Sequence, residues 1–187
     1  IKGNDRIKAY LLLATSCDGT LCTTAQFTSV RVVCNNTLQM ATRDSTGAVK
    51  VPHSTKFDPA QVKEALGIGF SNWDVFMKNL KQLSQRTVSL EEADGFIRTV
   101  LNEPEFTDDN SLGSKVYQKV SNLYLGEGMG SDLSSASGTA WGLVNAMTEY
   151  VDHHRRARSQ DNRLDSAWFG QGALLKQKAF NQALTLL

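Results

Sequence analysis

Hydrophobic and polar positions follow a short period near the start of the chain and a helical period after it. Residues 8–15 form an apolar run, Asp18 and Gly19 suit a tight turn, and the threonine-rich residues 20–27 suit a returning strand. The pattern predicts an antiparallel β-hairpin. Because residues 11–13 are consecutive leucines, we expect the first strand to be covered on both faces.

The segment after the hairpin carries two competing signals. Its valines are β-branched and favour a strand, whereas one helical face would be shared by Val30, Val33, Cys34 and Ala41. We expect a helix that begins near Val30. Residues 49–53 then predict a short strand that ends at a proline.

Helical periodicity dominates from Phe57 onward. Asp58 is placed to cap a first helix, and Ser89 with Glu92 matches the capping box of another. The helices are predicted over residues 60–84, 90–102 and 112–125. Residues 126–138 are rich in glycine and serine but lack the Lys-Ser/Thr ending of a phosphate loop, so a flexible linker or mobile loop is expected.

Two further helices are predicted after this loop. The first covers residues 139–158 and has an apolar stripe of Ala140, Leu143, Val144, Met147 and Val151. The second is expected to begin at an Asp165-Ser166 cap and to run to the end, with Phe180 and Leu184 on its buried side.

These elements predict an α+β fold in which a small antiparallel β-hairpin sheet precedes, and packs against, a mostly helical C-terminal part. The 187 residues suit a single domain. Its expected parts are the hairpin, helix and short strand (1–55), a helical region (56–125), a Gly/Ser-rich loop (126–138) and two C-terminal helices (139–187). Because the chain begins at Ile1, we expect a missing N-terminal part.

The charge balance is close to neutral overall but uneven along the chain. The formal net charge of +1 argues against a protein that coats duplex DNA by charge alone, and permits a local basic groove. Acidic residues dominate 103–132, whereas 153–178 is basic through Arg155, Arg156, Arg158, Arg163, Lys176 and Lys178. This asymmetry suits either a phosphate-binding surface or packing between subunits.

The three cysteines, Cys17, Cys22 and Cys34, are odd in number and lack paired C-x-x-C spacing. That usage suits a reducing compartment and gives little support to a zinc site. The longest apolar stretch, residues 9–14, is too short to span a bilayer. We therefore expect a cytoplasmic protein without a membrane partner, cofactor or bound metal.

The most informative polar pattern lies on the helix predicted over 139–158. At about 100° per residue, one stripe of it contains Trp141, Asn145, Glu149, Asp152 and Arg156. Two interpretations stay open: an interhelical polar network or solvated face, or a functional face that holds phosphate and stacks a base. A third possibility is a magnesium site formed by Glu149, Asp152 and Asp18.

Several segments together resemble a known family. They are Tyr10–Leu13 with Asp18-Gly19, the run Arg31-Val-Val-Cys-Asn-Asn-Thr-Leu38, Gly138–Gly142 with Asn145 to His153, and Arg163 to Lys176. In these motifs the chain is similar to the C-terminal part of the phage/plasmid-like proteins of unknown function, although that family usually has histidine at the position of Cys17. The resemblance implies a protein of mobile genetic elements in a host cell.

The leading hypothesis is a non-enzymatic, self-associating protein that binds or anneals single-stranded nucleic acid. Phosphate contacts are expected from Arg31, Lys50, Arg155, Arg156 and Arg163, neutral hydrogen bonds from Asn35 and Asn36, and base stacking from Trp141. The alternatives are a module that binds a host protein and, third, a magnesium-dependent nuclease. The cationic side chains from the hairpin half and the C-terminal helices are predicted to converge on one accessible groove.

Overall fold

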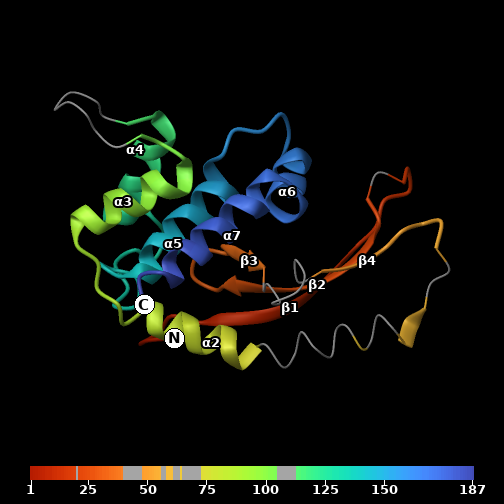
Figure 1. Ribbon diagram of the computed structural model, residues 1–187, viewed down its shortest axis with the longest axis horizontal. Coiled ribbons are helices and arrows are strands. Elements are labelled where there is room, and N and C mark those ends of the chain that lie inside the picture. Colours follow the sequence, from red (N-terminus) through yellow and green to blue (C-terminus); the bar gives the residue numbers. More distant parts are fainter. Residues whose placement is uncertain (20, 40–47, 56–57, 61–63, 65–72, 105–112) are drawn as a thin grey trace.

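The computed structural model describes residues 1–19, 21–39, 48–55, 58–60, 64, 73–104 and 113–187. A four-stranded antiparallel sheet lies beside a helical body, and one end of the sheet extends beyond the helices (Figure 1). The fold is α+β, as the sequence predicts. None of the helices in this part of the chain combines the length and apolar character needed to cross a membrane.

The predicted hairpin is confirmed. Strands β1 (Ile7–Ala14) and β2 (Thr23–Arg31) pair antiparallel with Leu11 opposite Phe27, and Gly19 in the turn has a φ of 77° that suits glycine. On its other side β2 pairs with β4 (Ala48–Val51) along its first half and with β3 (Thr37–Gln39) along its second half. This order makes β2 the central strand and β1 an edge strand.

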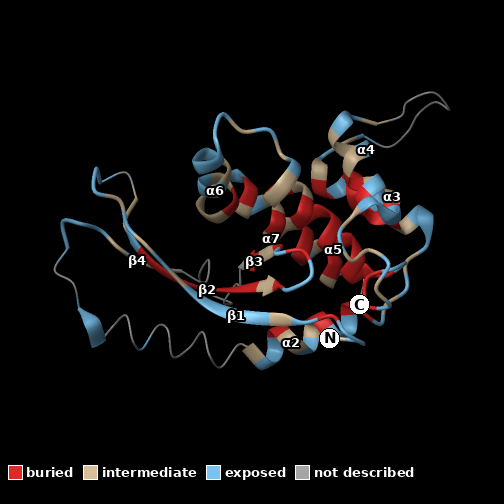
Figure 2. Ribbon diagram, turned by 180° about the vertical axis from the view of Figure 1, so that it is seen from behind, coloured by how far each residue is buried: buried red, intermediate tan, exposed pale blue. Residues whose placement is uncertain are grey.

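The expectation that the leucines of residues 11–13 are covered on both faces is wrong. Leu11 is 43% and Leu13 is 69% exposed, whereas every residue of β2 from Thr24 to Ser29 is buried. Figure 2 shows this contrast along the two strands. The reason is position in the sheet, because the central strand has neighbours on both edges and the edge strand has one.

The helix expected near Val30 is also wrong. Residues up to Arg31 belong to β2, residues 32–36 form a turn, and β3 follows. Asn35 takes a left-handed conformation (φ 56°) in this turn, a geometry that asparagine tolerates better than most residues. Pairing with the neighbouring strands therefore keeps Val30 in β2, while Val32 and Val33 lie in the turn. The rest of that segment, residues 40–47, lies outside the described residues.

The helical body begins with α2 (Trp73–Leu83), α3 (Leu90–Leu101) and α4 (Lys115–Asn122), which continues as the π-helical turn η1 (Leu123–Glu127). The predicted capping box is present at the start of α3: Glu92 N donates to Ser89 Oγ (3.1 Å) and Ser89 N to Glu92 Oε2 (2.9 Å). The Asp58 cap is present as well, since Ala60 N donates to Asp58 Oδ1 (2.9 Å). Most of the helix predicted between it and α2 lies outside the described residues.

The C-terminal region contains α5 (Ala140–Glu149), a π-helical turn η2 (Tyr150–His154), α6 (Gln160–Phe169) and α7 (Gln171–Leu184). The single final helix expected from Asp165 is therefore wrong. Ser159 caps α6 earlier, by accepting from Asn162 N (3.1 Å). The chain then breaks at Gly170, so that Gly172 packs tightly against Ser166 and Val151.

Helix α5 is the centre of the core, since all of its residues from Ala140 to Glu149 are buried. Its predicted apolar stripe, Val151 in η2 included, is buried as expected. Apolar side chains of the other helices complete this core, among them Leu80, Leu83, Phe96, Ile97, Val100, Leu123 and Phe180. The members of the polar stripe that lie on α5, Trp141, Asn145 and Glu149, are therefore also inside the protein, whereas Arg156 beyond η2 is exposed.

Candidate nucleic-acid interface

Trp141 is part of the interior and not a stacking platform. Its side chain is buried, and its indole Nε1 donates to Asp5 Oδ2 (3.2 Å). Of the two interpretations of the α5 stripe, the geometry supports the polar network. The prediction that Trp141 stacks on a base is therefore wrong, because no face of the ring is accessible.

Arg31 is held by the same carboxylate. Its Nε donates to both Asp5 oxygens (2.9 and 3.1 Å), and the two side chains are 2% and 0% exposed. The remaining guanidinium nitrogens donate to the backbone oxygens of Met129 (3.5 Å) and Gly130 (3.0 Å). The predicted phosphate contact from Arg31 is wrong, since its donors are used inside the protein.

Asp5 is an acceptor for three side chains at once. Ser135 Oγ donates to it (2.6 Å) in addition to Arg31 and Trp141. Burial by itself raises the pKa of Asp5, but the hydrogen bonds from Arg31 and Ser135 and the charge of Arg31 outweigh burial and lower the pKa below its ordinary value. Asp5 is thus ionised within the core.

The Gly/Ser-rich loop closes over this buried group. Its Met129 N donates to both oxygens of buried Glu149 (3.2 and 3.0 Å), and Ser135 and Ala136 are buried. Gly128 is needed for the close approach, because a Cβ there would lie 2.6 Å from Leu123 O. The loop expected to be a flexible linker is packed against α5 through these contacts.

Asn36 joins the network from the β2–β3 turn. It is buried, and its Nδ2 donates to the backbone oxygen of Asn145 (3.2 Å). Its predicted contact with nucleic acid is therefore wrong as well. Asn35, the next residue toward the N-terminus, is exposed. The two asparagines thus have opposite surroundings although they are neighbours in the chain.

A second buried ion pair joins three elements. Lys176 Nζ on α7 donates to Asp152 Oδ1 on η2 (2.7 Å) and to Thr37 Oγ1 on β3 (2.6 Å). Burial lowers the pKa of Lys176 below its ordinary value, although the charge of Asp152 and its hydrogen bond act in the opposite direction. The spacing of Lys176 from Ala179, Phe180 and Ala183, three, four and seven residues, is the helical signal that could have predicted its burial.

The hypothesis of a magnesium site is corrected by these pairings. Asp152 is bound by Lys176 and Thr37, and Glu149 by the loop amide, with His154 Nε2 3.7 Å from its Oε1. Asp18 lies in the hairpin turn, away from both. Over the residues that the structure describes, no three His, Cys, Asp or Glu side chains gather in a metal-binding arrangement.

Four arginines, two exposed and two half-buried, lie in the connection from η2 to α6 and in the first turn of α6. They lie within nine residues, and we call them the arginine segment: Arg155, Arg156, Arg158 and Arg163. Arg156 and Arg158 are exposed, and half-buried Arg155 donates from Nη1 to Ser166 Oγ (3.2 Å). No ion pair found among the described residues involves any of the four.

Of the predicted binding residues in the sheet half of the chain, Asn35 lies in the turn that adjoins the arginine segment. The turn that holds Asn35 contacts η2, since His153 Nε2 lies 3.1 Å from Cys34 O, just before the arginine segment. Lys50 is exposed on β4, in the extended end of the sheet and apart from α6 in both views (Figures 1 and 2). The eight predicted residues therefore do not form one groove, and three of them are interior.

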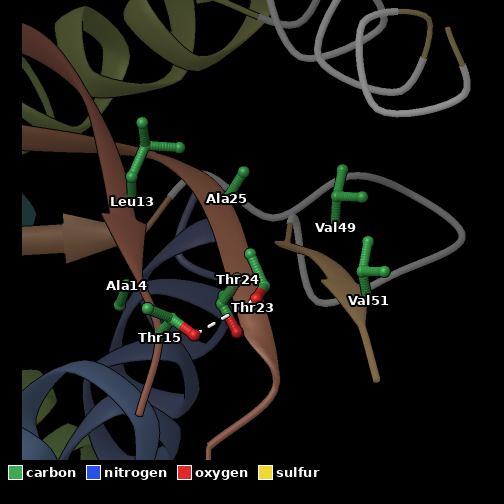
Figure 3. Close-up of a pocket in the computed structure, with 8 residues that line it drawn as sticks. All are labelled: Leu13, Ala14, Thr15, Thr23, Thr24, Ala25, Val49 and Val51. Carbon is green, nitrogen blue, oxygen red and sulfur yellow. Dashed lines mark hydrogen bonds between the residues drawn. The ribbon is translucent and has the colours of Figure 1, made fainter. Parts of the chain in front are cut away.

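An apolar groove of about 300 Å³ lies in the extended end of the sheet. Among the described residues it is lined from three strands and the turn by Leu13, Ala14, Thr15, Thr23, Thr24, Ala25, Val49 and Val51. Figure 3 shows Leu13, Ala25, Val49 and Val51 projecting to the same side of the sheet. None of these described lining residues carries a charge that could bind a phosphate.

Comparison with known proteins gives one match. The family model described as a domain of unknown function (DUF932) matches residues 1–168, which ends before α7 and its Lys176. No curated protein and no solved structure was found to match the chain.

Proposed function

The chain belongs to the DUF932 family, a domain of unknown function, and from that premise we propose that it binds single-stranded nucleic acid through the arginine segment. The binding is a non-enzymatic phosphate interaction of Arg155, Arg156, Arg158 and Arg163. Exposed Asn35, in the adjoining turn, adds a neutral hydrogen-bond donor.

The observation that carries the proposal is that these guanidinium groups form no ion pair with a carboxylate among the described residues. Buried arginine and lysine in this protein are matched by carboxylates, as in Arg31–Asp5 and Lys176–Asp152. The arginine segment has no such partner among the described residues, and the Nε of Arg163 is buried without a hydrogen-bond acceptor there. Planar guanidinium groups bind phosphate oxygens in a bidentate manner.

The start of α6 adds to the positive potential. Ser159 caps this ten-residue helix, and its free amides lie between Arg158 and Arg163. A helix N-terminus favours negative charge by partial charges equivalent to about half an elementary charge. Asp161 and Asp165 on α6 oppose the effect, which leaves a net positive surface of short extent. A flexible single strand can follow such a surface more easily than a rigid duplex.

The proposal also covers the kind of genetic element that encodes the protein and the compartment in which it acts. The motifs that resemble phage/plasmid-like proteins support a role in a mobile genetic element, acting in the cytoplasm of its host. All three cysteines are free, and burial raises the pKa of the Cys34 thiol, so it stays protonated. Free thiols are typical of proteins from a reducing compartment.

The test compares oligonucleotide binding by matched variants. A fluorescent single-stranded oligonucleotide of mixed sequence is titrated at low salt with the wild type, Arg156→Gln/Arg158→Gln and Lys78→Gln/Lys81→Gln. The two variants lose the same charge, but Lys78 and Lys81 are exposed on α2, outside the arginine segment. We expect weaker binding for the arginine variant alone.

Two results would contradict the proposal. One is absence of binding by the wild type at low salt. The other is an equal loss of affinity in both variants, because general charge rather than the arginine segment would then determine binding.

A further inference from the structure

β1 is an edge strand that exposes large apolar side chains. Among the described strands it pairs only with β2. Tyr10, Leu11 and Leu13 are exposed, Leu13 by 69%. Long apolar edge strands readily pair with another strand, and proteins usually protect them with charges or prolines. Within β1 the one charged residue is Lys8 near its start, so most of the strand is unprotected.

The outer edge of β1 presents the backbone groups of alternate residues. Val32 N donates to Arg6 O (2.9 Å), which turns the backbone of Arg6 toward β2. In an antiparallel pair, successive residues point toward and away from the partner in turn. The N–H and C=O groups that point to the open edge are therefore those of Ile7, Ala9, Leu11 and Leu13.

We propose that this open edge pairs antiparallel with β1 of a second copy of the chain, about a two-fold axis. Odd-numbered residues must bond to odd-numbered residues, and of the registers that satisfy this rule we consider the two centred on exposed apolar side chains, with Tyr10 opposite Tyr10 or Leu11 opposite Leu11. The Leu11 register matches the apolar stretch from Ala9 to Leu13 with itself, whereas the Tyr10 register places Leu12 opposite Lys8. This inference goes beyond nucleic-acid binding and does not depend on it.

The charges around β1 favour a second copy in this orientation. Arg6 and Lys8 lie at the start of the strand, and Asp18 lies in the turn beyond its end. Parallel pairing would place Lys8 beside Lys8 on neighbouring strands, which is destabilising. Antiparallel pairing moves the two lysines roughly 13–20 Å apart, at about 3.3 Å per residue, and turns each cationic start toward the other copy's acidic turn.

The apolar groove continues this surface. When Leu11 faces Leu11, Ala9 of the second copy lies opposite Leu13, and Ile7 of the second copy lies opposite Thr15. Both Leu13 and Thr15 line the groove (Figure 3). Residues directly opposite each other share one face of a sheet, so the second copy extends the apolar wall of the groove.

The test is the mass of the whole chain in solution over a range of concentrations, measured by sedimentation equilibrium. We expect the wild type to form a dimer. Leu11→Lys places two ammonium groups close together across the axis and should raise the dissociation constant about tenfold or more. Leu90→Lys is the control, because Leu90 is also an exposed leucine (74%) but lies on α3, outside the sheet.

Ala9→Pro provides an independent arm. The amide of Ala9 points to the open edge, so proline there removes a bond to the second copy and keeps those of the β1–β2 ladder. We expect a monomer that still unfolds cooperatively in urea, with a midpoint that no longer depends on protein concentration.

Three outcomes would overturn the inference: a wild type that is monomeric throughout, dimerisation that survives Leu11→Lys, or a monomeric wild type that uses β1 to capture a different polypeptide. Oligonucleotide binding is not a readout of this test, so its failure and the failure of the proposed function remain distinguishable.

Discussion

Arg31 and Arg156 carry the same guanidinium group in opposite surroundings. Arg31 is 2% exposed in its side chain and is bound by Asp5 and two backbone oxygens, whereas Arg156 is exposed and forms no ion pair in the described part of the chain. Removing a charge from water costs several kcal/mol unless a partner restores the interaction. The buried arginine thus contributes to the fold, and the exposed one is available to a ligand.

The basic residues of this protein therefore fall into two groups, structural cations and cations available to a ligand. A cation whose carboxylate partner comes from a distant part of the sequence is structural, as Arg31 with Asp5 and Lys176 with Asp152 show. The arginine segment forms no ion pair among the residues that the structure describes. Substitutions at the two kinds of site should therefore change different measurements.

The largest effect is expected from breaking the buried pair. Asp5→Ala leaves Arg31 buried without its counter-charge and removes an acceptor for Ser135 and Trp141. We expect the free energy of unfolding in urea to fall by about 3–5 kcal/mol. Asp132→Ala, at an exposed position, should change it by less than about 0.5 kcal/mol. Equal effects of the two substitutions would show that the Asp5 pair is not structural.

A smaller effect is expected from acid. The folded protein holds the pKa of Asp5 below the ordinary value of 3.8. The stabilisation is therefore complete above that value and is lost as the pH falls through the lower, folded-state pKa. Unfolding free energies measured at decreasing pH should fall more steeply for the wild type than for Asp5→Asn, which has no carboxyl group to titrate. Parallel curves would contradict this assignment.

The fold could be predicted where local signals and packing agree. The hairpin, the Ser89–Glu92 capping box and the apolar stripe of α5 follow from turn chemistry and periodicity. The segment after Val30 and the leucines of β1 could not, because strand pairing and position in the sheet determine them. The local sequence determines neither strand pairing nor position in the sheet.

Non-local contacts also explain why the predicted binding residues do not lie together on the surface. Trp141, Arg31 and Asn36 have the residue types of a nucleic-acid surface, but partners 136, 26 and 109 positions away hold them inside. Lys176, unlike Arg31, has a helical spacing from apolar residues that indicates burial. Asp5 has no periodic spacing from apolar residues, so only the folded structure shows that it is a buried hydrogen-bond acceptor.

The salt dependence of oligonucleotide affinity tests most directly whether the arginine segment, and not the interior residues, contacts the phosphates. Affinities of the wild type, Arg156→Gln/Arg158→Gln and Trp141→Phe are measured over a series of salt concentrations. For single strands each lost phosphate contact lowers the slope of log affinity against log salt by about 0.7, so the double variant should lose about 1.4. Trp141→Phe should keep the wild-type slope and affinity. An unchanged slope in the double variant, or a loss of affinity in Trp141→Phe with its fold intact, would contradict the account.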